Sequence, residues 1–353
     1  MTRGSDPAGR PALRWPLADE DAAQGRLIAG PAPVAGTGEL AGLELYHVRA
    51  RTLLNRVPDG SRMPFRWTIN AYRGCSHACA YCFARPTHAY LGLDTGEDFD
   101  RRLVVKVNAV DLARAELAAP GRAREPIAMG TNTDPYQPVE GRYRLTRGIV
   151  DALADAGNPF SILTKSTLIT RDIDLLAAAA RRTTVHAALS IGTLDREVWR
   201  ATEPHAPDPR RRMEAVAALN AAGVPCGVML APVIPGLSDD RRRLDEVVRA
   251  AVDAGAVSIT PIMLHLRDGV REHYLERLGR THPEHATRLA GEYVRGNAPA
   301  GLARDMVRRV RESVARHGGP GPEHEDYEEA RFGSRRRPPA GAGGRGQSQL
   351  TLI

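Results

Sequence analysis

Apolar segments of strand length alternate with amphipathic segments of helix length between about residues 66 and 265. The apolar segments are short and partly β-branched, and they occupy 67–71, 103–107, 126–131, 160–164, 183–191, 224–233 and 256–264. Between them, apolar residues recur at helical spacing over 143–157, 171–182, 210–223 and 239–255. Three of these four helical segments close on a glycine, which favours helix ends. Strands that alternate with helices of this size predict βαβ units and a parallel sheet, and therefore an α/β fold.

The number of units leaves two arrangements. Six or seven strand–helix units are too few for a complete eight-stranded barrel, but they fit an incomplete one. A doubly wound open sheet is the alternative that periodicity alone does not exclude. Polar segments favour the barrel, because they follow five of the strands and barrel enzymes build their sites at the carboxyl ends of strands. These segments are the cysteine loop, TNTDPYQP, TKS, SIGT and PVIPG.

Composition divides the chain into four parts. Residues 1–45 are rich in Gly, Pro and Ala, and we predict that they are flexible. The barrel then spans 46–265, and the helical pattern of 266–317 predicts a C-terminal extension that covers its open side. Residues 318–353 pass from an acidic stretch to a basic low-complexity tail, for which we predict disorder.

Charge and cysteine content limit the class of protein. The formal net charge is +7, which favours a polyanionic partner such as nucleic acid. Three of the four cysteines lie within eight residues of each other, so the chain does not fit a secreted disulfide framework. No stretch approaches the roughly 20 apolar residues of a membrane helix, and the N-terminus lacks the apolar region of a signal peptide. We therefore expect a cytoplasmic protein with no membrane partner.

The cysteine loop carries the main chemical signal. In AYRGCSHACAYCFARP, Cys75, Cys79 and Cys82 have the spacing C-x3-C-x2-C, which lets three thiolates point into one concave loop. Three thiolates can ligate three irons of a cuboidal 4Fe–4S cluster and leave the fourth iron open for chemistry. Gly74 allows the backbone to turn tightly into the loop.

A zinc site is the alternative for the same cysteines. It would use the three thiolates together with His77 or the distant Cys226. Zinc motifs more often consist of two close cysteine pairs, and the sequence has no second pair. Cys226 lies within the apolar run VPCGVML, so we predict that it is a buried core residue.

The loop and its neighbouring segments resemble the radical S-adenosylmethionine (SAM) superfamily, in the branch grouped with spore photoproduct lyase. C-x3-C-x2-C with Tyr81 before the last cysteine resembles the superfamily signature. The branch is matched in order by MPFRWTINAYRGCSHACAYCFARPTHAYLGLD, TDPYQPVE, TKSTLITRDIDLL, SIGTLD with EPHAPDPRRR, and APVIPGLSDD, over about 50–290. The resemblance implies a partial (β/α)6 TIM-like barrel. It also implies a lyase-like or modifying enzyme that reductively cleaves SAM at a 4Fe–4S cluster, forming a 5′-deoxyadenosyl radical that abstracts hydrogen.

The resemblance further implies cofactor contacts. The three cysteines would be the cluster ligands, the backbone of Tyr81 would lie near the adenine, and PVIPG would pass it. The family's Gly-Gly-Glu strand edge has no literal match, and TNTD occupies that place. The polar residues that would then face SAM are Thr131, Asn132, Thr133, Lys165 and Ser190. An external electron donor of the flavodoxin or ferredoxin type is also implied.

Glu203 and Arg212 complete this set through the segment EPHAPDPRRR. A carboxylate suits the ribose diol and an arginine fork suits the SAM carboxylate, so we expect Glu203 to bind the ribose and Arg212 the carboxylate. The alternative is a surface ion pair between the two.

Three features bear on the substrate and favour nucleic acid, in DNA repair or modification. They are the arginine runs 210–212 and 241–243, the resemblance to a DNA repair lyase, and the final residues 349–353. The segment Gln349-Leu350-Thr351-Leu352-Ile353 resembles the peptide by which bacterial repair enzymes dock on the DNA sliding clamp. The alternatives are a radical SAM enzyme for a small molecule or a peptide, and a zinc-stabilised DNA-binding module without catalysis.

One departure from the branch concerns the return of hydrogen to the substrate. The lyase carries a further cysteine downstream of the cluster loop, whereas this sequence has no cysteine between Cys82 and Cys226. Tyr136 is the phenolic hydrogen donor that we consider instead. Thymine-dimer repair therefore does not follow from the resemblance.

Overall fold

A curved parallel sheet forms the centre of the protein in the computed structural model, which describes residues 32–58, 61, 63, 65–293 and 296–320. The sheet has the strand order β11-β10-β9-β8-β7-β4-β3. Six of its strands are parallel, and β3 adds to one edge in antiparallel orientation. The strands are β3 (Leu54–Arg56), β4 (Trp67–Ile69), β7 (Ile127–Met129), β8 (Phe160–Thr164), β9 (Val185–Ser190), β10 (Cys226–Val233) and β11 (Ile259–Met263).

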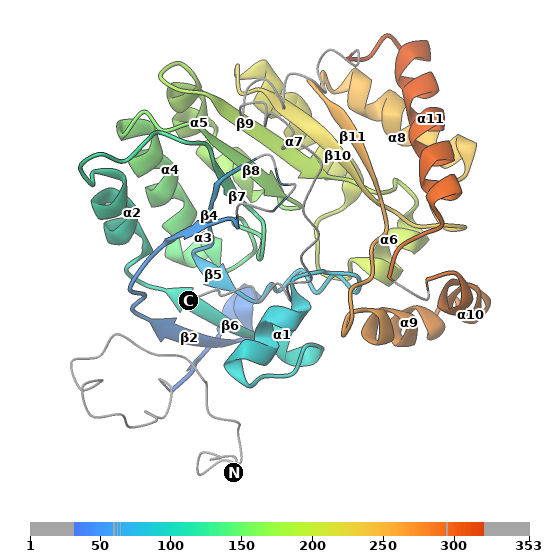
Figure 1. The fold of residues 1–353 in the computed structure, drawn as a ribbon, viewed down its shortest axis with the longest axis horizontal. Coiled ribbons are helices and arrows are strands. Elements are labelled where there is room, and N and C mark those ends of the chain that lie inside the picture. Colours follow the sequence, from blue (N-terminus) through green and yellow to red (C-terminus); the bar gives the residue numbers. More distant parts are fainter. Residues whose placement is uncertain (1–31, 59–60, 62, 64, 294–295, 321–353) are drawn as a thin grey trace, which may run out of the picture.

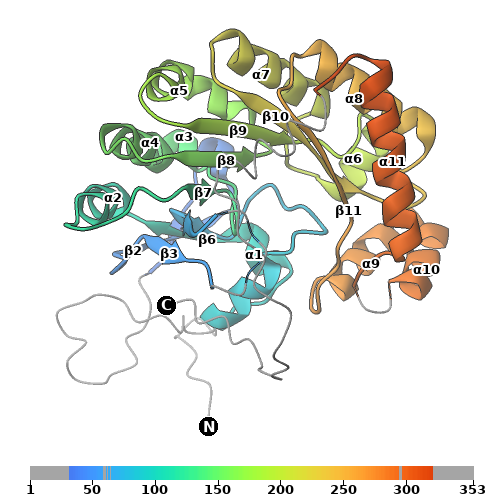
Figure 2. The same ribbon diagram turned by 45° about the horizontal axis from the view of Figure 1, so that its top comes forward.

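Helices cover one face of this sheet, and the strands form an arch inside them (Figures 1 and 2). The outer layer contains α2 (Ala109–Leu117), α4 (Leu145–Asp155), α5 (Ile173–Ala180), α7 (Pro209–Ala221) and α8 (Arg241–Asp253). A doubly wound sheet would carry helices on both faces. The partial (β/α)6 barrel is therefore confirmed, and the doubly wound alternative is not.

The apolar pattern of the sequence explains this packing. In β9, Val185 and Leu189 are fully buried, and so are Val216 and Leu219 of α7 in the same core cluster. A strand with few polar residues and a helix with one apolar stripe bury those surfaces against each other. Asp208 and Asp240 cap the N-termini of α7 and α8 with their side chains, so these helices start close to their predicted positions.

One predicted barrel strand belongs elsewhere. The apolar run 103–107 forms β6 (Arg102–Lys106), which lies in a separate four-stranded sheet of order β1-β2-β6-β5. There β6 pairs in parallel with β2 (Glu44–Val48) and antiparallel with β5 (Tyr72–Arg73). Periodicity identifies a buried strand but does not specify its pairing partner, which is why the assignment of 103–107 to the barrel is wrong.

The N-terminal boundary also differs in part. Strand β1 (Val34–Ala35) pairs antiparallel with β2, and both begin within the segment 1–45 that we predict to be flexible. The prediction for 1–31 and most of the tail prediction for 318–353 lie outside the described residues, as does the clamp-like peptide of residues 349–353.

The C-terminal extension is helical, as predicted, and contains α9 (Arg271–Gly279), α10 (Pro283–Glu292) and α11 (Ala300–Arg316). Helix α11 lies beside α8 and extends the outer layer (Figure 1). Asp245 of α8 holds this contact by accepting hydrogen bonds from Ser313 and Arg316. Within the described part of the chain, no helix combines the length and apolar character that a membrane crossing needs.

Candidate active site

The cysteine loop follows β5 and begins at Gly74. The φ angle of Gly74 is +78°, and a Cβ atom there would lie 2.9 Å from the carbonyl oxygen of Phe99. Both observations require glycine, as predicted. The backbone N–H of Cys75 then donates to that same carbonyl, at 3.0 Å. Because Phe99 is on α1 (Glu97–Arg101), this short helix fixes the start of the loop.

Burial disfavours the charged form of the three thiols in the loop. Cys75 and Cys79 are buried and Cys82 is half-buried. Burial raises the pKa of Cys79 to about 12 and that of Cys75 well above its ordinary value. Thiolates at Cys79 and Cys82 would raise the pKa of Cys75 further, because both lie near it. Thiolates at these positions therefore need a bound positive charge, such as metal ions.

Two side chains after β7 support the loop from the barrel side. Thr133 donates from Oγ1 to the carbonyl oxygen of Gly74, at 2.6 Å, and Gln137 donates to the same oxygen, at 3.1 Å. Gln137 also accepts from the backbone N–H of Ser76, at 3.0 Å. Thr133 thus holds the cysteine loop. Gln137 was missed at the sequence level, although its segment TDPYQP was recognised as polar.

A network of polar side chains lies at the carboxyl ends of β8 and β9, next to the loop. Nζ of Lys165 donates to Oγ of Ser190, at 2.7 Å, and lies 5.6 Å from the ring centre of Tyr81. The hydroxyl of Tyr81 donates to Glu203, whose other oxygen pairs with Arg212. The structure therefore brings together five of the residues predicted to bind SAM.

The geometry of Arg212 differs from the predicted one. Its guanidinium donates to the carbonyls of Pro207 and Ser190, at 2.8 and 2.9 Å, and to Oε2 of Glu203, at 2.5 Å. Arg212 is thus engaged by the protein itself. The ion pair with Glu203 does form, but it is buried rather than at the surface, because the Arg212 side chain is 0% exposed.

The strand end after β7 is organised by Asp134, which was also missed at the sequence level. Its carboxylate accepts from Oγ1 of Thr164, at 2.6 Å, and from the backbone N–H of Lys165, at 2.7 Å. Burial alone would raise the pKa of Asp134, yet His77 and these donors lower it. Asp134 therefore fixes the ends of β7 and β8 relative to each other.

The preceding residues form a weaker set of contacts. The backbone N–H of Asn132 donates to Oδ1 of Asn70, at 3.2 Å, and Thr131 lies 3.4 Å from the Asn70 amide. Thr131 and Asn132 are half-buried at the barrel mouth, so they remain accessible to a ligand.

The sequence matches one protein family over half of its length. Residues 69–248 match the Radical SAM superfamily. The chain belongs to the radical SAM superfamily. Uncharacterized protein Rv2578c of Mycobacterium tuberculosis is 46% identical over 277 residues, which cover 78% of this chain and 82% of that protein. The Radical SAM Nalpha-GlyT isomerase of Pseudomonas phage M6 is 27% identical over 179 residues, 50% of this chain and 35% of the phage protein.

Solved structures show the same fold. A mutant of spore photoproduct lyase with dinucleoside spore photoproduct superposes with a TM-score of 0.59 at 18% identity, covering 82% of this chain and 85% of the lyase. Another mutant, with bound AdoMet and the photoproduct, gives a TM-score of 0.56 at 18% identity over 80% and 84%. The protein is thus a radical SAM enzyme with the fold of spore photoproduct lyase, and its family implies SAM and an iron–sulfur cluster as cofactors.

The residues present fit a radical SAM cluster better than a single metal ion. Among the described residues, no three His, Cys, Asp or Glu side chains converge on a point that could hold one ion. A multi-iron cluster takes each thiolate on a separate iron, so its ligands need no common point. Cys226 is fully buried in the main core on β10, as predicted. Cys226 therefore does not complete a zinc site with the cysteine loop.

Tyr136 occupies a different part of the radical SAM barrel. It is fully buried in the main core, and burial raises the pKa of its hydroxyl, with further contributions in the same direction from Asp172 and Glu140. No hydrogen bond among the described residues links its side chain to the network around Glu203. This placement does not favour its predicted role as hydrogen donor, which stays untested.

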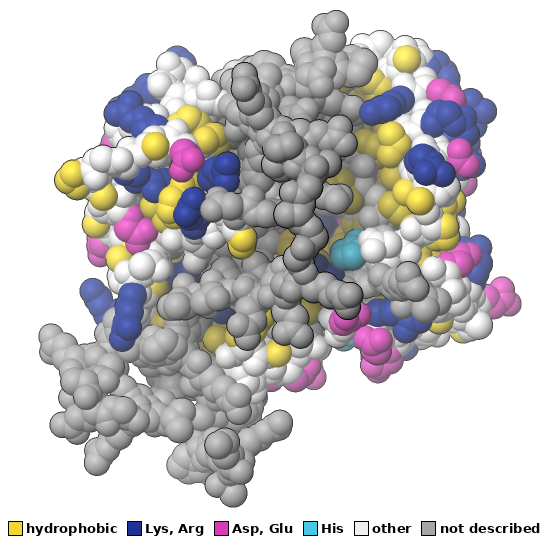
Figure 3. All heavy atoms as spheres, viewed as in Figure 1, with side chains coloured by type: hydrophobic (Ala, Val, Ile, Leu, Met, Phe, Trp, Pro, Cys, Tyr) yellow, Lys and Arg dark blue, Asp and Glu magenta, His cyan; other side chains and the backbone are white. Residues whose placement is uncertain are grey.

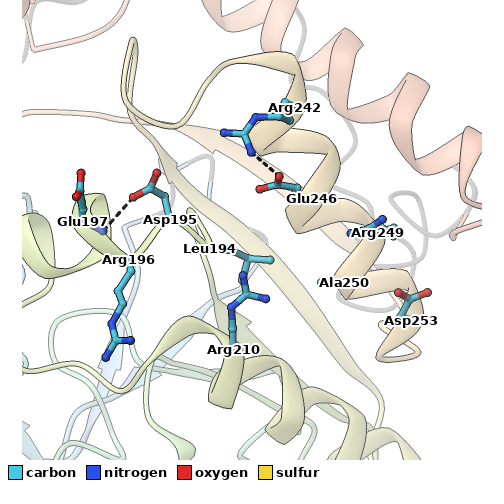
Figure 4. Close-up of a pocket in the computed structure, with 10 residues that line it drawn as sticks. All are labelled: Leu194, Asp195, Arg196, Glu197, Arg210, Arg242, Glu246, Arg249, Ala250 and Asp253. Carbon is cyan, nitrogen blue, oxygen red and sulfur yellow. Dashed lines mark hydrogen bonds and ion pairs between the residues drawn. The ribbon is translucent and has the colours of Figure 1, made fainter.

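A surface pocket of about 800 Å³ lies outside the radical SAM site, on the helical layer (Figure 4). It is lined by residues at the start of α6 (Arg196–Thr202), by Arg210 and by α8. Arginines and acids alternate there, and Arg242 pairs with Glu246 at 2.7 Å. None of the predicted site residues lines this pocket.

Proposed function

We propose that this radical SAM enzyme binds a 4Fe–4S cluster through Cys75, Cys79 and Cys82 and acts on nucleic acid, in DNA repair or modification. The observation that carries the proposal is the location of the cysteine loop beside the polar network, at the carboxyl end of a barrel of the spore photoproduct lyase fold. That lyase is known with a dinucleoside bound, and a phage relative is named as an isomerase of a GlyT group.

The protein's own residues would bind and orient SAM. The bound cluster and SAM would together supply a radical able to abstract hydrogen from the substrate. Lys165 and Glu203 place a cation and an anion next to Tyr81, with 3.9 Å between Nζ and Oε1. The cation suits the carboxylate of the SAM amino acid moiety, and the anion suits its amino group or the ribose hydroxyls. Arg212 keeps Glu203 ionised: burial would raise the pKa of Glu203, and Arg212 and Lys165 lower it.

The arginine runs on the helices are less suited to nucleic acid than their sequence suggests. Arg212 is buried in the site, and in the second run Arg241 pairs with Glu312, Arg242 with Glu246 and Arg243 with Asp195. These pairs lie within a mixed surface of charges, and Figure 3 shows Lys and Arg side chains on both flanks of the molecule, with acidic ones among them. A face whose arginines are already paired attracts phosphate weakly.

The segment 49–73 is a better candidate for phosphate contacts. It contains six arginines and a single acid, Asp59. Arg49 and Arg51 are exposed and have no ion pair or hydrogen bond among the described residues. Between them, Ala50 is held by Asn108 through two hydrogen bonds of 2.9 Å, so the backbone that carries both arginines is fixed. The segment leads directly into the cysteine loop, which would bring a bound strand near the site.

Salt-dependent binding tests this assignment. The double variant R49Q/R51Q should lower DNA affinity and reduce the slope of log K against log salt by about two, because each lost phosphate contact removes about one unit. R241Q/R242Q removes the same charge from the paired face and serves as the matched control. Equal losses in both variants would contradict a local contact surface, and no DNA binding by the wild type would favour a small-molecule or peptide substrate.

The reaction is tested separately. The anaerobically reconstituted protein with SAM and dithionite should release 5′-deoxyadenosine, and oligonucleotides should increase the release. A reconstituted protein that contains zinc but no iron, and that does not cleave SAM, would instead favour the zinc-stabilised DNA-binding module. A flavodoxin or ferredoxin would replace dithionite in the cell.

We further propose that residues 349–353 dock on the sliding clamp, in which case deleting them should abolish a clamp pull-down and leave SAM cleavage intact.

A further inference from the structure

Arg85 is fully buried three residues after the last cysteine of the loop. All five of its N–H groups have acceptors. Two of them converge on the carbonyl oxygen of Cys79, at 3.1 and 3.0 Å. The others reach the carbonyls of Thr95 and Gly96, at 3.1 and 2.8 Å, and Oδ1 of Asp100, at 2.7 Å. A guanidinium whose whole donor set is used in this way has one fixed position.

These contacts tie the ligand loop to helix α1. Arg85 donates to the carbonyl of Cys79, the second cysteine, and Asp100 of α1 accepts a hydrogen bond from Arg85. The neighbouring residue Phe99 accepts the backbone N–H of Cys75 and lies under the guanidinium, with 5.1 Å from its ring centre to Cζ. The same two residues of α1 therefore hold the first cysteine directly and the second through Arg85.

The pair also places two opposite charges beside the loop. Nη2 of Arg85 donates both to the carbonyl of Cys79, at 3.0 Å, and to Oδ1 of Asp100, at 2.7 Å, so both charges lie next to the ligand loop. Asp100 is 8% exposed and Arg277 approaches it at 3.9 Å. A buried fixed charge next to a redox centre acts on it more strongly than a charge exposed to water.

We propose that Arg85 is a positioning residue whose buried guanidinium, balanced by Asp100, sets the reduction potential of the cluster held by Cys75, Cys79 and Cys82. The inference rests on the proposed cluster. Reduction adds negative charge to the cluster, and hydrogen bonds, net charge and solvent exposure determine how readily it is accepted. The positive charge of Arg85 raises the potential and the negative charge of Asp100 lowers it.

The test is the midpoint potential of the reconstituted enzyme without SAM, followed by electron paramagnetic resonance of the reduced cluster. D100N should shift the potential upward, because it removes a buried negative charge and keeps the size of the side chain. E97Q is the matched control: it removes an acid from the same helix, but Glu97 is 69% exposed, so its potential should equal that of the wild type. R85Q should shift the potential downward, and R85K, which keeps the charge, should restore most of it.

Each outcome decides a separate point. An unchanged or lowered potential in D100N, or equal shifts in D100N and E97Q, would overturn the role of the Arg85–Asp100 pair. If R85Q takes up no iron, D100N and R85K provide the test. R85K keeps the positive charge, so a midpoint potential far below the wild-type value in R85K would also overturn the role of the pair. A wild-type protein that holds no iron–sulfur cluster would instead refute the proposed function, so the two failures are distinguishable.

Discussion

Glu203 and Arg212 form a buried ion pair at the centre of the candidate SAM site. Oε2 of Glu203 lies 2.5 Å from Nη2 of Arg212, and their side chains are 7% and 0% exposed. Glu203 extends from the end of α6 and Arg212 from the first turns of α7, so the pair links two helices through the site. Removal of one partner would leave an unpaired buried charge, which is far more costly than loss of a surface pair.

The first prediction follows from this pair. R212M should lower the free energy of unfolding by about 3–5 kcal/mol, the usual cost of stranding a buried charge, and should weaken SAM binding because Glu203 loses its orientation. Denaturant unfolding and SAM titration of the reconstituted protein measure the two effects. R308M is the control: Arg308 contacts Asp305 and Glu312 at the exposed surface of α11, so its stability should not change. Equal stabilities of the two variants would contradict the prediction.

The second prediction concerns the cysteines. C79A should bind no intact cluster and should not cleave SAM, whereas C226A should retain wild-type iron and sulfide because Cys226 lies in the core of β10. C226A should lose about 1–2 kcal/mol of stability from the small cavity that it creates. Iron and sulfide analysis with 5′-deoxyadenosine release distinguishes the two cysteines. SAM cleavage by C79A would refute the ligand assignment, and iron loss in C226A would add Cys226 to the ligands.

The third prediction concerns the close approach of two strand ends at the site. A Cβ atom on Gly192 would lie 2.3 Å from the carbonyl oxygen of Pro232, which is too close for any side chain. G192A should therefore force the ends of β9 and β10 apart, at a cost of about 1–3 kcal/mol, and weaken SAM binding. In contrast, nothing lies within 4 Å of a Cβ atom at Gly301 of α11. G301A should fold with at least wild-type stability, and the prediction is wrong if thermal unfolding gives both variants the same midpoint.

The fourth prediction is a pH dependence of stability from His88, which packs behind the cysteine loop. Its Nε2 lies 2.9 Å from the carbonyl oxygen of Arg102, and its ring contacts Phe99 edge-on. Burial lowers the pKa of His88 to about 4, whereas in the unfolded chain it is near its ordinary value of about 6.5. The contribution is thus complete above pH 6.5 and is lost as the pH falls toward 4.

The comparison of wild type with H88Q isolates this effect. Between pH 7.5 and 5.5 the wild type should lose about 1 kcal/mol more than H88Q, since one pKa unit corresponds to about 1.4 kcal/mol. Glutamine can still donate to the Arg102 carbonyl, so the variant keeps the hydrogen bond. Denaturant unfolding at both pH values provides the measurement, and parallel losses in the two proteins would mean that His88 titrates normally.

The amino-acid sequence by itself determined the local features of this protein. Strand β8 has the same bounds as the predicted run 160–164. Helices α4 and α8 lie within the helical segments predicted from apolar spacing, and α7 begins one residue before its predicted segment. Gly74 was recognised because a turn of positive φ suits glycine alone, and the three cysteines because ligand spacing along a loop is a local property. Hydrophobic period and backbone restriction act over a few residues, so they are readable without the fold.

Only the tertiary structure decided which distant residues meet. The run 103–107 belongs to a second sheet, and Arg212 donates to Glu203 and to peptide carbonyls. Arg241 of α8 pairs with Glu312 of α11, and Arg243 pairs with Asp195, the residue before α6. Arg85 carried no signal in the sequence, because its role depends on acceptors at Cys79, Thr95 and Asp100 that converge only after folding. A buried charge is stable only where several partners are brought together in space, and the order of residues along a chain does not encode that meeting directly.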